Sequence, residues 1–234
     1  MYCDIIMVQD KLEFVGVFMN KEWSELNKDA KILLNKKSSF KDGINKLIQL
    51  RTLLINEWKN AMKDLSIEDY SAQPFKNRDG YESKTIAYSI FHVFRIEDIV
   101  LNTLINNRQQ IFIRDNYQKK MNSMIITTGN ELIRESISSF SKTLIIEELW
   151  KYAKKVFEES NKWLLVIEYD DLKIVHSEID KERIRNTNTV AESEIWLIDY
   201  WCGKDIKGLL GIPFSRHWIM HLEASLRIRN KLVK

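Results

Sequence analysis

Proline and glycine are scarce in this chain, with two prolines and seven glycines among 234 residues. Because these residues start and end turns, their scarcity favours long helices over a turn-rich β architecture. The two cysteines, Cys3 and Cys202, are too few and too far apart for a disulfide framework, so we expect a reducing cytoplasmic compartment. No uninterrupted apolar run reaches the length of a membrane span.

The chain also lacks a large excess of either charge. The chain has 36 basic and 33 acidic residues, a net charge of +3. Nucleic-acid-binding proteins usually have a strongly basic face, so we expect no nucleic-acid partner. Because no apolar run is long enough to span a membrane, we expect no membrane partner either. The start, MYCDIIMVQDKLEFVGVF, has acidic residues inside its apolar stretch and no basic leader. We therefore expect no signal peptide.

Apolar residues recur at helical spacing along most of the chain and predict an all-α protein. We expect helices at about 21–35, 39–65, 83–106, 131–138, 142–168, 190–202 and 213–231. The expected connections are a loop at 66–80, a stretch with a short helix at 107–130, a charged bridge at 169–189 and a glycine-containing loop at 203–213. We predict a four-helix bundle with extra short helices over residues 38–234, and an N-terminal extension over 1–37 packed on it. The first twenty residues fit either a strand or a helix.

Three of the four histidines stand where helices can bring them together. His217 and His221 form an H-x-x-x-H pair, whose spacing places both imidazoles on one helix face. His92 lies within a separate helical pattern, between Phe91 and Phe94. Two imidazoles from one helix and a third from another suffice to hold a divalent ion with an open position. The alternative is three histidines at the edge of the core, each hydrogen-bonded to the main chain or a carboxylate.

Two segments resemble a known family. SKTIAYSIFHVFRIEDIVLNTLI and LIDYWCGKDIKGLLGIPFSRHWIMHLEASLRIRNKL are similar to the DinB/YfiT-like metalloenzymes, with one histidine on the second bundle helix and an H-x-x-x-H pair on the last. The resemblance covers about 38–234. It implies an up-up-down-down four-helix bundle with a long connection between its middle helices. It also implies zinc or nickel held by His92, His217 and His221, with water completing the coordination.

A three-histidine site without a carboxylate keeps the full charge of its ion, which lowers the pKa of a bound water or thiol. The resemblance implies a metal-dependent transferase in which a low-molecular-weight thiol attacks an electrophilic small molecule, so that no protein nucleophile is needed. Two alternatives stay open. One is a metal-hydroxide hydrolase, and the other is a non-catalytic metal-binding or stress-related bundle.

Other residues near the histidines have two interpretations each. Arg95 and Arg216 either bind an anionic cofactor or substrate, or form surface ion pairs. Acidic residues either orient the imidazoles or form solvent-facing salt bridges; they are Glu97, Asp98, Asp199 and Glu223. Aromatic residues either line the pocket or belong to the core; they are Tyr88, Trp196, Tyr200, Trp201 and Trp218.

Two further residues are given minor roles. Cys202 is a candidate near the site, although a small buried apolar group is its expected role. The fourth histidine, His176, lies among charges and is expected in a solvated loop. The sequence leaves the oligomeric state open, with a homodimer through an exposed helix face as one candidate.

Overall fold

The computed structural model describes residues 21–75 and 83–233, and every regular element in these ranges is helical. The long helices are one at 21–33, α2 (Phe40–Met62), α4 (Ile86–Asp98), α8 (Ile146–Val166) and α12 (His217–Leu232). Shorter α-helices are α3 (Ile67–Ser71), α5 (Ile111–Arg114), α6 (Tyr117–Lys120), α7 (Glu135–Thr143), α9 (Glu178–Arg185), α10 (Trp196–Cys202) and α11 (Ile206–Leu210). No helix in the described ranges is long and apolar enough to cross a membrane.

Two π-helical segments adjoin the helices that contain the three histidines of the site. The first, η3 (Ile99–Ile105), continues α4 without a break, and the second, η6 (Ile212–Arg216), leads directly into α12. Short 3₁₀ turns complete the fold: η1 (Lys37–Ser39), η4 (Tyr169–Lys173) and η5 (Glu192–Glu194). Since π-helical turns occur often at functional sites, their position indicates a site between α4 and α12.

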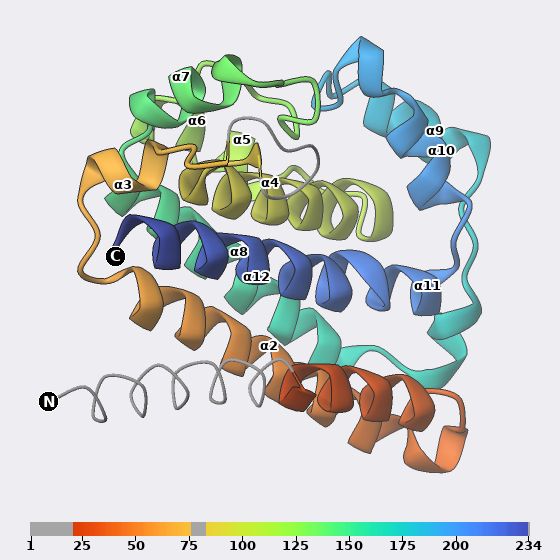
Figure 1. Ribbon diagram of the computed structural model, residues 1–234. Helices are drawn as coiled ribbons and strands as arrows, with labels where there is room; N and C mark the ends of the chain where they lie inside the picture. The colour runs from red at the N-terminus through yellow and green to blue at the C-terminus, as the bar shows by residue number, and fades with distance from the viewer. Residues whose placement is uncertain (1–20, 76–82, 234) are drawn as a thin grey trace, which may run out of the picture.

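Helices α2, α4, α8 and α12 pack against one another around the core (Figure 1). The middle two, α4 and α8, are parallel, because their contacts advance together along both helices. The Tyr152 hydroxyl lies 3.2 Å from the Phe94 carbonyl oxygen, and the Ser160 hydroxyl donates to the Glu97 carboxylate. Parallel neighbours need a long crossover, and residues 107–145 with α5, α6 and α7 provide it.

Helix α12 runs antiparallel to α4, since His221 contacts His92 while the earlier Trp218 contacts the later Glu97. Figure 1 shows α2 beside α12 and running in the same direction. In chain order the directions are therefore up, down, down, up. The expected up-up-down-down order is wrong, because the hairpin-like return from α2 to α4 reverses the chain before the long crossover.

Every residue of α4 is buried, so this helix is the centre of the molecule. Its N-terminus is capped by Thr85, whose hydroxyl accepts a hydrogen bond from the Tyr88 amide at 3.0 Å. A helix buried on all sides is stable only when its neighbours cover its apolar residues and bind its polar ones. Helices α7, α8, α12 and α3 cover it here. The described part of the chain thus places His92 inside the protein.

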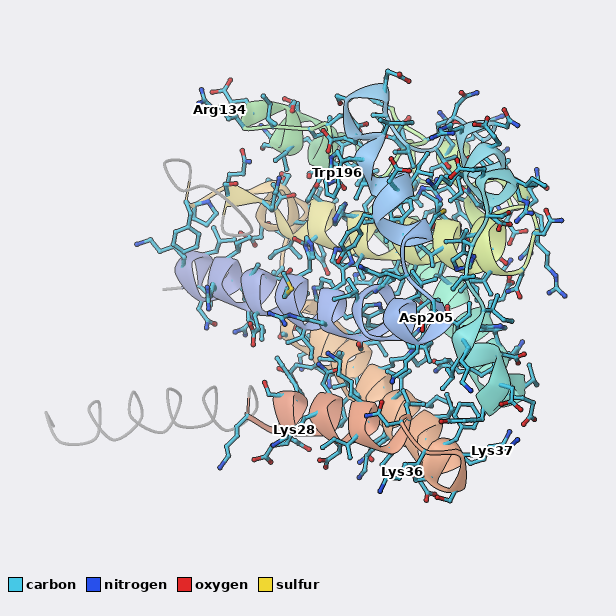
Figure 2. The ribbon with its side chains drawn as sticks, turned by 90° about the vertical axis from the view of Figure 1, so that its right-hand side faces the viewer. Lys28, Lys36, Lys37, Arg134, Trp196 and Asp205 are labelled. Atoms are coloured by element: carbon cyan, nitrogen blue, oxygen red, sulfur yellow. The ribbon has the colours of Figure 1, made fainter. Side chains whose placement is uncertain are left out.

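The helix at 21–33 packs antiparallel on α2, with a tight turn between them that Figure 2 marks at Lys36 and Lys37. Trp23 and Leu26 join the same core as α2 and α4. A Cβ on Gly43 would lie 2.8 Å from the Leu34 main-chain nitrogen, so only glycine permits this close approach. The expected strand or helix within residues 1–20 lies outside the described residues.

The helix predictions are mostly confirmed, with errors at segments rich in glycine or charge. The stretch 203–213 was expected as a loop and instead contains α11, capped by the Asp205 side chain, which accepts from the Gly208 amide at 2.8 Å. The charged bridge at 169–189 forms η4 and α9. The helix expected at 131–138 is α7, which begins at Glu135. Local caps explain α11, η4 and α9, because side-chain caps stabilise short helices that apolar periodicity does not indicate.

Candidate metal centre

His92, His217 and His221 converge in the core, as the sequence predicts. Helix α4 holds His92 near its middle, and α12 begins at His217 and presents His221 one turn later. The three ring centroids lie 4.7 to 5.0 Å apart. Each residue offers one ring nitrogen, and these nitrogens all lie within 4.8 Å of one another. Antiparallel packing of α4 on α12 makes this meeting possible.

A main-chain carbonyl fixes the orientation of His92. Its Nδ1 lies 2.9 Å from the Thr128 carbonyl oxygen. Since a carbonyl only accepts hydrogen bonds, Nδ1 carries the proton and Nε2 keeps its lone pair. The ring of Tyr88, one helical turn earlier, stacks on His92 at 5.3 Å between centroids. This combination of an anchored Nδ1–H and a free Nε2 is typical of histidines that bind metals.

The three imidazoles fit a divalent transition metal. The Nδ1 atom of His217 is buried and has no hydrogen-bond partner among the described residues, which is costly unless another group binds it. Metal–nitrogen bonds of about 2.1 Å in a tetrahedron place the nitrogens about 3.4 Å apart. In the structure the three nitrogens lie within 4.8 Å of one another. Small rotations of the side chains would bring them to the spacing around a bound ion.

Burial keeps all three imidazoles neutral. It lowers the pKa of His92 to about 4, while the Thr128 carbonyl opposes this shift. The pKa values of His217 and His221 also fall well below the usual 6.5, chiefly through burial and then through neighbouring histidines. Metal binding requires the neutral ring. The site is therefore ready for a cation at neutral pH.

This burial predicts how the stability of the metal-free protein depends on pH. Because the folded pKa of His92 is below the unfolded value of 6.5, its contribution is fully present above pH 6.5 and is lost as pH falls toward 4. From this residue alone we expect a loss of about 3 kcal/mol over that window, at about 1.4 kcal/mol per pH unit. Urea unfolding between pH 7 and pH 4 measures it. An equally steep dependence in His92→Gln would contradict the assignment to His92.

The loop that presents Thr128 is tied to α4 by two buried charges. The Asp98 carboxylate accepts from the main-chain amides of Ile111 and Phe112, both at 2.9 Å. The Arg95 guanidinium donates to the Ile126 carbonyl at 2.6 Å. The crossover is thus bound to α4 at two places, by Asp98 near its start and by Arg95 just before Thr128. Arg95 and Asp98 act on His92 through this loop and do not contact it.

Gly129 is the residue most sensitive to change in that loop. It has a φ of +81°, and a Cβ there would lie 3.1 Å from the Tyr88 ring that stacks on His92. We expect Gly129→Ala to destabilise the fold by about 1–2 kcal/mol and to weaken metal binding about 10- to 100-fold, because the Thr128 carbonyl shifts. Metal titration and urea unfolding measure both effects. Gly211→Ala, whose Cβ would meet no atom closer than 3.4 Å, should change neither.

A second buried network holds α12 in register with α4. The Glu97 carboxylate accepts two hydrogen bonds from Arg51, at 2.6 and 2.9 Å, and one from the Trp218 indole at 2.7 Å. The Ser160 hydroxyl donates to it at 2.5 Å. Glu97 and Arg51 are both fully buried. Since Trp218 adjoins His217, this network positions the histidine pair.

The acidic residues do not contact the imidazoles as one interpretation expected. Glu97 and Asp98 are fully buried, so a solvent-facing role is wrong for both. Asp199 is exposed and pairs with Lys181 at 2.9 Å, which confirms that role for it. Glu223 is half-buried on α12, and burial raises its pKa. The sequence does not indicate these burials, because the partner of Glu97 is Arg51 on another helix and Asp98 binds the main-chain amides of Ile111 and Phe112.

A cavity of about 430 Å³ reaches the site from the side of α10. It is lined by His92, Ile96, Asn130, Trp196, Leu197, Tyr200, Trp201, Ile212, Pro213, Arg216, His217 and Met220. Arg216 is exposed at this cavity, whereas Arg95 does not line it and is fully buried over the Phe112 ring. A cavity that ends at two of the three histidines gives a small molecule access to the ion.

The remaining candidates lie away from the histidines. Cys202 is buried in the core, where burial raises its pKa to about 11, so it is a protonated apolar group. Tyr88 and Trp218 are core residues that contact the site, while Trp196, Tyr200 and Trp201 line the cavity. His176 lies in a loop as expected, but it is half-buried. A second cavity, of about 520 Å³ beside α11, has none of the histidines in its wall.

The residues that the structure describes form an all-helical fold with a candidate three-histidine metal centre. No family model matches the chain, and no curated protein matches it.

Proposed function

We propose that this protein is a metal-dependent enzyme of the DinB/YfiT-like type. In it, His92, His217 and His221 hold zinc or nickel, and a low-molecular-weight thiol or water attacks an electrophilic small molecule. The observation that supports this most is the convergence of three neutral imidazoles, two of which lie at the end of a cavity. The family resemblance of the two histidine-containing segments adds to it.

The cavity favours an enzyme over a metal store or a structural site. Structural zinc sites are closed by four protein ligands, whereas catalytic sites keep three and leave one position open. Here the described residues supply three imidazoles, and no aspartate, glutamate or cysteine joins the cluster. When bound, a divalent ion would lower the pKa of a coordinated thiol or water.

The chain's own residues then have distinct roles. The Thr128 carbonyl fixes the tautomer of His92, and the network around Glu97 keeps α12 in place. Trp196, Tyr200 and Trp201 form an aromatic wall along the cavity that leads to His92 and His217. Cys202 takes no part, because its thiol is protonated at neutral pH and does not line the cavity.

Elemental analysis tests the metal centre. Protein purified without chelator and without a nickel affinity column should contain about one transition-metal ion per chain. Metal-anomalous diffraction should place that ion among the three imidazoles. A chain that stays metal-free after incubation with zinc or nickel would contradict the proposal.

Thiol consumption tests the reaction. With a model electrophile, we expect thiol loss that requires the ion and stops when a chelator removes it. Hydrolysis of an activated ester without added thiol would instead support the alternative metal hydrolase. Metal binding with neither reaction would support a non-catalytic role.

A further inference from the structure

The outer half of the cavity is built from a pair of aromatic side chains. Trp196 and Tyr200 stand one turn apart on α10, so both face the same side of that helix. They are 51% and 39% exposed, although both are large and line the cavity. Figure 2 labels Trp196 on the side of the molecule formed by α10 and α11. Large aromatic rings left uncovered in a cavity favour a ligand that covers them.

The aromatic pair is held in place before any ligand arrives. The Trp196 indole donates to the Glu194 carboxylate at 3.0 Å, and its ring meets that of Tyr200 edge-on at 6.2 Å between centroids. The Lys204 ammonium lies 3.9 Å from the Tyr200 ring centroid. A preorganised ring loses little conformational freedom on binding. This wall therefore suits a flat partner.

The charge at the cavity is positive. Arg216 lines it and is exposed, and within the described ranges its guanidinium forms no ion pair. Asp199 is paired with Lys181. Glu194 accepts from the Trp196 indole and keeps its charge, which the Lys204 ammonium over the Tyr200 ring offsets. The three imidazoles are uncharged, so they leave the charge of a bound cation uncompensated. A guanidinium is well suited to a planar carboxylate, which it binds with two parallel hydrogen bonds.

We infer that the substrate of this cavity is a flat aromatic molecule with a single negative charge, an aromatic carboxylate. Its ring packs on Trp196 and Tyr200, and its carboxylate pairs with Arg216. His92 and His217 line the same cavity, so the bound molecule lies in the space that reaches both. The inference rests on the proposed function only for the reaction that follows binding.

Calorimetric titration with three matched probes tests the inference. The probes are 2-naphthoate, the uncharged 2-naphthylmethanol and the saturated decahydro-2-naphthoate. We expect 2-naphthoate to bind the metal-loaded protein about tenfold more tightly than either of the others, since each lacks one of the two contacts. Equal binding of the charged and uncharged probes would overturn the inference, and so would the absence of any binding.

Variants assign the two contacts. Arg216→Gln should weaken 2-naphthoate about tenfold and leave 2-naphthylmethanol unchanged. Arg108→Gln, another exposed arginine that does not line the cavity, is the matched control and should change neither. Trp196→Ala should weaken both aromatic probes and spare the saturated one. An unaltered affinity for 2-naphthoate in Arg216→Gln would overturn the assignment of the anion site.

The titrations separate this inference from the proposed function. Repeated on chelator-treated protein, 2-naphthoate should still discriminate between wild type and Arg216→Gln. If the chain proved unable to bind metal, that difference would uphold the inference although the proposed function failed. If metal bound while no probe responded to Arg216, the inference would fail and the metal centre would stand.

Discussion

Replacing His217 with alanine is expected to abolish metal binding. The substitution removes one of three ligands and leaves a void beside two buried neutral rings. Metal content should fall from about one ion per chain to near zero. Removal of a group that only orients a ligand lowers metal affinity about 10- to 100-fold, and loss of the ligand itself should lower it further. Elemental analysis and zinc titration measure the effect.

The chain provides a matched control for this experiment. His176 is the one histidine outside the cluster, and it lies in the loop between η4 and α9. His176→Ala should retain full metal content. Circular dichroism of both variants shows whether the fold persists. Full metal occupancy in a folded His217→Ala variant would refute the assignment of His217 as a ligand.

Breaking the Arg51–Glu97 pair is expected to have the largest effect on stability. Both side chains are fully buried, so Glu97→Leu leaves an unpaired guanidinium in the core and the Trp218 indole without its acceptor. We expect a loss of about 3–5 kcal/mol in the free energy of unfolding. Because Trp218 adjoins His217, metal affinity should fall as well. Guanidinium unfolding and zinc titration measure the two effects.

A double variant separates the effect of an unpaired buried charge from the effect of losing the ion pair. Arg51→Met combined with Glu97→Leu removes both charges, and we expect it to be more stable than Glu97→Leu alone. Glu168→Gln breaks the exposed pair with Lys41 and should cost less than about 1 kcal/mol. A single variant no less stable than the double variant would show that the unpaired charge is not the cause.

The sequence predicts the long helices and the histidine cluster because both depend on regular spacing. Apolar periodicity locates α2, α8 and α12 to within a few residues. The spacing of His217 and His221 requires only a helix, and His92 requires only that its helix be buried. Local pattern therefore suffices for the three residues that form the candidate centre.

Other parts of the site depend on tertiary contacts that leave little signal in sequence. The group that orients His92 is a main-chain carbonyl, which any residue at position 128 would supply. The connection expected at 107–130 ends near this carbonyl, and nothing in its sequence indicates a contact with α4. Arg95 was expected at the pocket and is instead buried, because its role is to hold that connection. The helix directions likewise depend on a crossover whose course no local pattern specifies.

The π-helical segment η6 separates the histidine pair from the helix before it. A π-turn holds one residue more than an α-turn between hydrogen-bonded groups. Deleting one residue between Ile212 and Arg216 would restore the α-helical phase and turn all that precedes it by about 100° around the axis. The imidazoles would keep their positions, whereas α11 and α10, which contains Trp196 and Trp201, would move away from them. The extra residue of the π-turn therefore sets where α10 and α11, and with them the wall of the cavity, lie relative to the histidine pair.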